Sequence, residues 1–239
     1  MKRWHVILVV VLGIGGLSLL VWGMYALYEK SLPGKLENAV HQNDIVAIQS
    51  ILDSHPEFVK RVINSWEGTA LTIAVINSDD ATVKALLRYP FDLNYGCPSG
   101  GTPLQWAGYV RPELVRGLVE AGADVNFACV TANAEGTPLQ NAAWGGHYES
   151  VVVLVEHGAA VNTIDTTERR PPPVMMAIWS ANGRWDERKK ILQYLFDHGA
   201  IMPTLTTPGM QGKGMIYYAK FYEAPPEIVE FLKQHGAKE

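Results

Sequence analysis

A seven-residue motif recurs along this chain at a nearly constant interval. It reads Gly-Thr-Ala-Leu-Thr-Ile-Ala from Gly68, Gly-Thr-Pro-Leu-Gln-Trp-Ala from Gly101 and Gly-Thr-Pro-Leu-Gln-Asn-Ala from Gly136, so the steps are 33 and 35 residues. An interval of this size is typical of a repeat protein, in which each unit buries its apolar face against its neighbours. Such a scaffold has no single deep cleft by default, so we look for function on its surface.

A second motif closes each copy, and together the two motifs resemble those of the ankyrin family. The closing motif occupies residues 92–94, 122–126 and 158–162. Threonine and proline at the start of the first motif suit the cap and first turn of a helix. The glycine of the closing motif suits the left-handed end of a second helix. The resemblance implies an all-α solenoid of helix-turn-helix units joined by hairpin fingers.

Weaker copies of the motifs extend the predicted ankyrin-repeat domain over residues 31–239. The first and last copies are atypical, as expected where a terminal unit exposes one face to water. The domain is predicted to contain about six units, with approximate bounds 36–62, 63–94, 95–126, 127–162, 163–200 and 201–237.

An uncharged stretch of 23 residues, from Val6 to Tyr28, precedes the array. As a helix it would be about 35 Å long, which is enough to cross a bilayer. We therefore predict that residues 1–30 form a transmembrane signal-anchor. The alternative is a cleaved signal peptide, although the apolar part of a signal peptide is usually only about 7–15 residues long.

The charges beside this stretch predict its orientation. Lys2 and Arg3 precede it, whereas Glu29 and Lys30 balance one another on the other side. The more positive end of a membrane span stays in the cytoplasm. Whether anchored or cleaved, the array is therefore expected outside the cytoplasmic membrane, in the periplasm if the source is a bacterium.

The composition argues against a nucleic-acid partner and against an enzyme. Residues 31–239 carry a formal charge of −6, whereas nucleic-acid binding requires basic patches. We find no nucleophile-base set, phosphate-binding loop or cluster with metal-ligand spacing. The sequence therefore predicts a non-enzymatic protein without a cofactor or metal ion.

The two cysteines, Cys97 and Cys129, occupy matching places three residues after the asparagine that ends a unit. An oxidising compartment would favour a disulfide between them. Equivalent points in neighbouring ankyrin units tend to lie too far apart for a bridge, which needs Cα atoms within about 7 Å. The longer finger after Cys129 could shorten that distance. The sequence leaves the disulfide open.

One position of the inner helices is unusually rich in large apolar side chains. It lies two residues after the alanine that packs between units, about 200° around the helix. By the ankyrin resemblance this side faces the concave groove. The position is occupied, unit by unit, by His41, Ile76, Tyr109, Trp144, Trp179 and Phe221, and Trp66 and Tyr222 are expected to extend the same surface.

Because aromatic residues dominate interface hot spots, this row predicts a partner-binding surface. The rings could instead pack against adjacent helices and only stiffen the stack. Resemblance to small exported bacterial ankyrin proteins suggests an inhibitor or immunity protein against an envelope-acting toxin. The alternatives are a glycan or cell-wall binding module that uses the same rings, and a membrane-tethered scaffold.

Two polar features are predicted to have structural rather than functional roles. His147, at the predicted turn between two helices, is expected to bond the local backbone. Lys189 and Lys190, beside Glu187 and Arg188, are expected on the exposed face of an outer helix.

Overall fold

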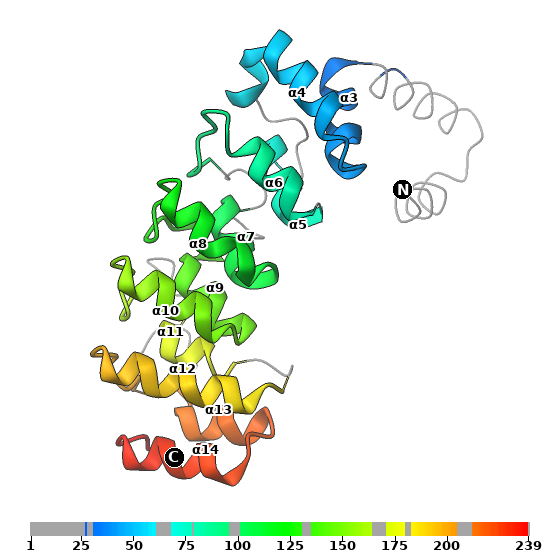
Figure 1. Cartoon of the computed structure of the whole chain (residues 1–239). Coiled ribbons are helices and arrows are strands. Elements are labelled where there is room, and N and C mark those ends of the chain that lie inside the picture. Colours follow the sequence, from blue (N-terminus) through cyan, green and yellow to red (C-terminus); the bar gives the residue numbers. More distant parts are fainter. Residues whose placement is uncertain are drawn as a thin grey trace, which may run out of the picture.

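The structure is a computed structural model that describes residues 27, 31–60, 68–77, 79–95, 101–130, 135–163, 171–179, 183–204 and 212–238. Within these ranges the helices form six consecutive pairs that stack into one elongated array (Figure 1). The pairs, each with its inner helix first, are α3 (Leu32–His41) with α4 (Ile45–Ser54), α5 (Ala70–Asn77) with α6 (Asp80–Leu86), α7 (Pro103–Val110) with α8 (Pro112–Glu120), α9 (Pro138–Gly145) with α10 (Tyr148–Glu156), α11 (Pro173–Met176) with α12 (Trp185–Asp197), and α13 (Met215–Phe221) with α14 (Pro226–Gln234).

The architecture fits the predicted ankyrin solenoid. The first inner helix begins at Leu32 rather than near Leu36. A short 3-10 helix, η1 (Pro56–Lys60), follows α4. One finger forms a small antiparallel hairpin of β1 (Cys129–Val130) and β2 (Glu135–Gly136). The buried residues form one continuous core from Leu36 to Leu232, to which both inner and outer helices contribute.

The repeated Thr-Pro-Leu-Gln motif both starts an inner helix and connects it to the next unit. In α7, the Thr102 hydroxyl and the Gln105 side chain form a reciprocal capping box, and α9 repeats it with Thr137 and Gln140. The amide of Gln105 also donates to the carbonyl oxygen of Gly136, and that of Gln140 donates to Pro171, 2.9 Å away. Both glutamines are buried, and these bonds satisfy their polar groups.

The asparagine of the closing motif connects units along the finger edge of the stack. Asn126 Oδ1 accepts the N–H of Ala160 at 2.8 Å, and its Nδ2 donates to the carbonyl of Gly158 at 2.9 Å. Asn162 repeats both bonds one unit later, to Ile201 and Gly199. A short polar side chain at this point of the motif thus holds each unit in register with its successor.

Gly108 lies where α7 and α9 pack most closely. A Cβ at this position would be 2.9 Å from the carbonyl oxygen of Pro138 and 3.4 Å from the backbone nitrogen of Ala142. Gly108→Val is expected to lower the free energy of unfolding by about 1–3 kcal/mol, because backbone atoms must move apart. Thermal and urea unfolding followed by circular dichroism would measure the loss.

Gly117 in α8 is the matched control, because no atom lies within 4 Å of a Cβ built there. Gly117→Val should change stability by no more than about 0.5 kcal/mol, since valine is a slightly better helix former than glycine. If the two variants lost equal amounts of stability, the packing between α7 and α9 would not restrict the size of the side chain at position 108.

Among the described residues, no helix is long and apolar enough to cross a membrane. The predicted span from residue 6 to 28 lies outside these residues, except for Leu27. It therefore stays a prediction.

Candidate partner-binding surface

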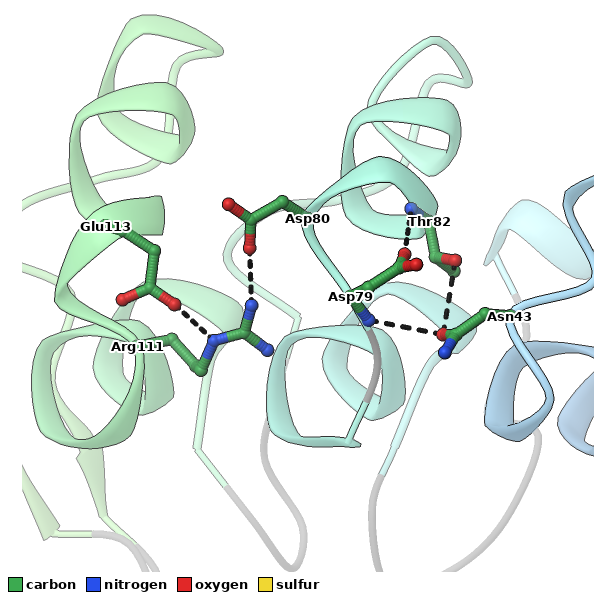
Figure 2. Close-up of polar contacts among 6 residues, drawn as sticks. All are labelled: Asn43, Asp79, Asp80, Thr82, Arg111 and Glu113. Carbon is green, nitrogen blue, oxygen red and sulfur yellow. Dashed lines mark hydrogen bonds and ion pairs between the residues drawn. The ribbon is translucent and has the colours of Figure 1, made fainter.

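The turns between inner and outer helices form one edge of the stack, where polar side chains connect neighbouring units. Asn43, in the left-handed region at φ 56°, accepts the N–H of Asp79 at 3.2 Å and the hydroxyl of Thr82 at 3.3 Å (Figure 2). Asp79 in turn caps α6 by accepting the N–H of Thr82 at 2.8 Å. The first turn of the array therefore holds the start of the second outer helix.

Arg111 makes the next connection along this edge. Its guanidinium pairs with Asp80 of the preceding unit and with Glu113 of its own outer helix (Figure 2). The hydrogen bond to Glu113 is the main reason that the pKa of Arg111 is raised. Burial raises the pKa of Glu113, but the hydrogen bond and charge of Arg111 outweigh it, so that pKa lies below its usual value. Both groups are thus ionised at neutral pH.

His147 connects the third and fourth units. Its Nε2 lies 2.9 Å from the carbonyl oxygen of Tyr109, and its Nδ1 lies 3.2 Å from Nη1 of Arg184. A guanidinium can only donate, so Nδ1 accepts and the imidazole is neutral with its proton on Nε2. The prediction that His147 bonds the local backbone is wrong. The partner is a helix-terminal carbonyl 38 positions away, which α7 itself cannot satisfy.

Lys189 and Lys190 are exposed as predicted, whereas Arg188 beside them is fully buried. It donates through Nη2 to the carbonyl of Trp144 at 2.8 Å and through Nη1 to that of Ala177 at 2.6 Å. Nε donates to Gly183 at 3.0 Å. One guanidinium thus satisfies the last carbonyls of α9 and those just after α11. Burial, and then the charge of Arg184, lower the pKa of Arg188 to about 10, so it remains protonated.

Counting back from the closing glycine explains this placement. Arg111, His147 and Arg188 each stand 11 residues before the glycine that follows their outer helix. Because α12 starts one turn earlier than α10 relative to that glycine, the connecting residue falls inside the helix instead of before it. The same register could have identified Arg188 from sequence.

Two residues with predicted site rings, Tyr109 and Trp144, are the penultimate residues of α7 and α9, next to these turns. Tyr109 and Trp144 are stacked, with centroids 4.7 Å apart and planes 7° apart. Tyr109 is 37% exposed, and Trp144 is half-buried and packs against the core. The carbonyls of both residues are the ones bonded by His147 and Arg188. The ring pair is therefore partly open to solvent, and hydrogen bonds to the two carbonyls hold the backbone of both residues in place.

A second group of rings occupies the last two units. Phe221, at the end of α13, is 64% exposed, and its ring centroid lies 5.0 Å from that of Tyr222. Trp179 is half-buried, 6.1 Å from the ring of Tyr218, and it follows α11 rather than lying within it. Burial raises the pKa of Tyr222, against the effect of a hydrogen bond with Trp179.

The other predicted site residues are distributed as follows. His41 is exposed and lies 3.8 Å from Glu37, while Ile76 is half-buried. Trp66 and Cys97 lie outside the described residues, and nothing is described of the Cys129 side chain. The disulfide therefore stays a prediction. In the described ranges no group of acidic, histidine or cysteine side chains could hold a metal ion.

Two exposed side chains escaped the sequence analysis. Val110 is 40% exposed beside Tyr109. Tyr217 is 39% exposed, and Lys213 Nζ lies 3.8 Å from its ring centroid. Tyr217 stands two residues before the packing alanine, where Gln105 in α7 contacts the next unit. Tyr217 is exposed at this position, whereas Gln105 is buried.

The neutral state of His147 predicts a pH dependence of stability. Burial, followed by the charges of Arg184 and Arg188, lowers its pKa below 6.5, although the Tyr109 carbonyl and Glu113 oppose this. The unfolded chain takes up this proton at higher pH than the folded one. The stabilisation that comes from keeping His147 neutral is therefore complete above about pH 6.5. It is lost as the pH falls through the pKa that His147 has in the folded chain.

We expect the melting temperature of the wild-type chain to fall further between pH 7.5 and pH 5 than that of His147→Gln, whose amide does not titrate. The remaining histidines are common to both proteins and cancel in the comparison. Parallel melting curves of the two proteins across this range would contradict the assignment of a neutral, buried His147.

Models of known protein families match two parts of the chain. A model of three ankyrin repeats matches residues 36–129, and a model of a single ankyrin repeat matches residues 136–166. The chain belongs to the ankyrin-repeat family. The helix pairs α11 with α12 and α13 with α14 continue the ankyrin array beyond both matches.

Among curated proteins, the human (Homo sapiens) protein named "Ankyrin repeat and KH domain-containing protein 1" is similar to this ankyrin chain. The two are 34% identical over 103 residues, which are 42% of this chain and only 4% of the human protein. The chain therefore spans a small fraction of that relative. Ankyrin repeats are generally non-enzymatic modules that bind other proteins, so membership of the family indicates a protein–protein interaction module.

Proposed function

We propose that the ankyrin array binds a protein partner through its concave side, with Tyr109, Trp144, Trp179 and Phe221 as apolar anchors. One observation carries the proposal. Of the eight large hydrophobic side chains exposed in the described residues, four form two pairs: the anchor Tyr109 with Val110 on α7, and the anchor Phe221 with Tyr217 on α13, whose ring centroids are 6.2 Å apart. Exposed apolar side chains that lie next to one another mark an interaction surface more often than isolated ones do.

The rigidity of the rings supports the same proposal. Tyr109 and Trp144 stack on each other, and hydrogen bonds to their carbonyls fix the ends of α7 and α9. Rings held in this way lose little conformational entropy when a partner covers them, which leaves more of the contact energy for binding. The same stacking would also serve a purely structural role, so the test must separate binding from stability.

We further propose that the array acts outside the cytoplasmic membrane, attached through residues 6–28, as an inhibitor of an envelope-acting protein. The uncharged stretch and the preceding Lys2 and Arg3 support this orientation. A protease added to intact spheroplasts should cleave the array of a chain tagged at its C-terminus. An array that is cleaved only after lysis would contradict the location and leave the binding surface unaffected.

Capture from an envelope extract tests the binding surface. Full-length protein in detergent micelles is expected to retain a protein partner, whereas Trp144→Ala combined with Trp179→Ala should lose it. Tyr148→Ala changes a half-buried ring on the outer helix of the same unit and should retain it. Circular dichroism must show that the double variant is folded. Equal retention by both variants, or retention of purified cell-wall polysaccharide in place of a protein, would contradict the proposal.

A further inference from the structure

The turn edge next to the Tyr109–Trp144 pair carries two neighbouring guanidinium groups, those of Arg184 and Arg188. Arg184 is exposed and adopts the left-handed region at φ 49°, which few residues other than glycine occupy. Its stem lies over Gly146, where a Cβ would be 3.5 Å from Arg184 Cδ. Its Nη1 donates to Nδ1 of His147, whose Nε2 donates to the Tyr109 carbonyl. A single imidazole thus separates this guanidinium from the end of α7.

Two neighbouring acidic groups pair with other cations. Glu113 pairs with Arg111, and Glu187 pairs with Lys190 at 2.8 Å. Asp186 lines a shallow depression on the outer surface together with Tyr148 and Lys189. In the part of the chain that the structure describes, Arg184 forms no ion pair.

A second cation lies beside Arg184. The buried Arg188 is close enough to Arg184 for their charges to repel, and both guanidinium side chains lie against Gly146. An anion bound by the outer N–H groups of Arg184 would reduce this repulsion. A carboxylate suits the planar fork of a guanidinium, which can donate two parallel hydrogen bonds to it.

We infer that Arg184 and the Tyr109–Trp144 pair form one recognition site for a protein segment that carries a carboxylate beside an aromatic or aliphatic side chain. The apolar side chain covers the two rings while Asp or Glu pairs with Arg184. This inference rests on the proposed function and specifies the partner of the same surface. Recognition of this kind needs both features, because the pair of rings alone would accept any apolar side chain.

Selection from a library of random twelve-residue peptides displayed on phage tests the inference. The full-length chain is immobilised through its C-terminus in detergent micelles. We expect enriched peptides to contain Asp or Glu within three positions of Trp, Tyr, Phe or Leu. A fluorescently labelled peptide from this set is then titrated with wild-type protein and variants. The dissociation constant should rise about tenfold for Arg184→Gln, since a charge-assisted hydrogen bond is lost.

Two matched variants make the titration specific. Lys189→Gln removes an exposed positive charge from α12, the helix that Arg184 precedes. Lys189 lies on the outer surface, so this change should alter affinity less than twofold. Arg184→Gly removes the guanidinium and suits the left-handed backbone, so it should fold and bind as weakly as Arg184→Gln. Added salt should weaken peptide binding more in the wild type than in either variant at position 184.

The outcomes separate this inference from the proposed function. Peptides without acidic enrichment, or unchanged affinity for both Arg184 variants while Trp144→Ala binds poorly, would overturn the inference alone. Peptides that bind Trp144→Ala as well as they bind wild type would overturn the proposed function. A library that yields no binding peptide would contradict both.

Discussion

Replacement of Arg188 by alanine is expected to lower the free energy of unfolding by about 3–5 kcal/mol. The substitution removes the donors for three carbonyl oxygens, those of Trp144, Ala177 and Gly183, and leaves a cavity where a fully buried side chain stood. For a domain of this size, each kcal/mol corresponds to about 2–4 °C, so the melting temperature should fall by about 6–20 °C. Thermal unfolding followed by circular dichroism would measure the change.

Two further variants isolate the cause. Lys189→Ala changes the exposed neighbour of Arg188 and should alter stability by no more than about 0.5 kcal/mol. Arg188→Met fills much of the cavity without donating, so its loss should lie between those of the two alanine variants. If Arg188→Ala were as stable as Lys189→Ala, the guanidinium would not be the connection between the fourth and fifth units that its hydrogen bonds indicate.

Replacement of Trp144 by alanine should weaken binding of the captured partner by about 30-fold or more. That factor corresponds to about 2 kcal/mol, the loss typical of a central aromatic hot spot. The indole supplies contact area directly and also supports the stacked Tyr109 ring, so its removal affects both. Isothermal titration of the purified partner with wild-type and variant chains would measure the change.

Tyr148→Ala provides the comparison for this effect. Its ring is also half-buried and belongs to the same unit, but it lies on α10, 5.9 Å from the ring of Tyr194 on α12. We expect less than a threefold change in affinity. If both variants lost affinity equally and melted at equally lowered temperatures, the loss would reflect damaged folding rather than a lost contact.

Much of the fold could be predicted from the sequence because local chemistry and repetition agree. Thr102 and Thr137 were expected to cap inner helices, and the structure shows them doing so within capping boxes. The packing of leucine and alanine three residues apart is equally local, since both lie on one helix face, and Leu104 and Ala107 are both buried. These features need only the nearest residues and a neighbouring copy of the same unit.

The site was less predictable because it depends on departures from the repeat. Arg188 appeared to belong to an exposed charged run, and only the extra turn at the start of α12 brings it into the interior. Tyr217 is exposed although Gln105, at the same position of the motif in α7, is buried. The face-to-face contact of Tyr109 with Trp144 depends on the spacing of α7 and α9, which Gly108 makes possible. A row of rings in the sequence does not reveal how they contact one another.

Hydroxyl-radical footprinting of the full-length chain, with and without its captured partner, tests most directly whether the concave rings form the binding surface. Mass spectrometry would compare the oxidation rates of Tyr109, Trp144 and Phe221 with those of Tyr148 and Tyr194 on the outer helices. We predict that the partner slows oxidation of the first three severalfold and leaves the outer tyrosines unchanged. Protection of the outer tyrosines while Tyr109, Trp144 and Phe221 oxidise at their free rates would contradict the account.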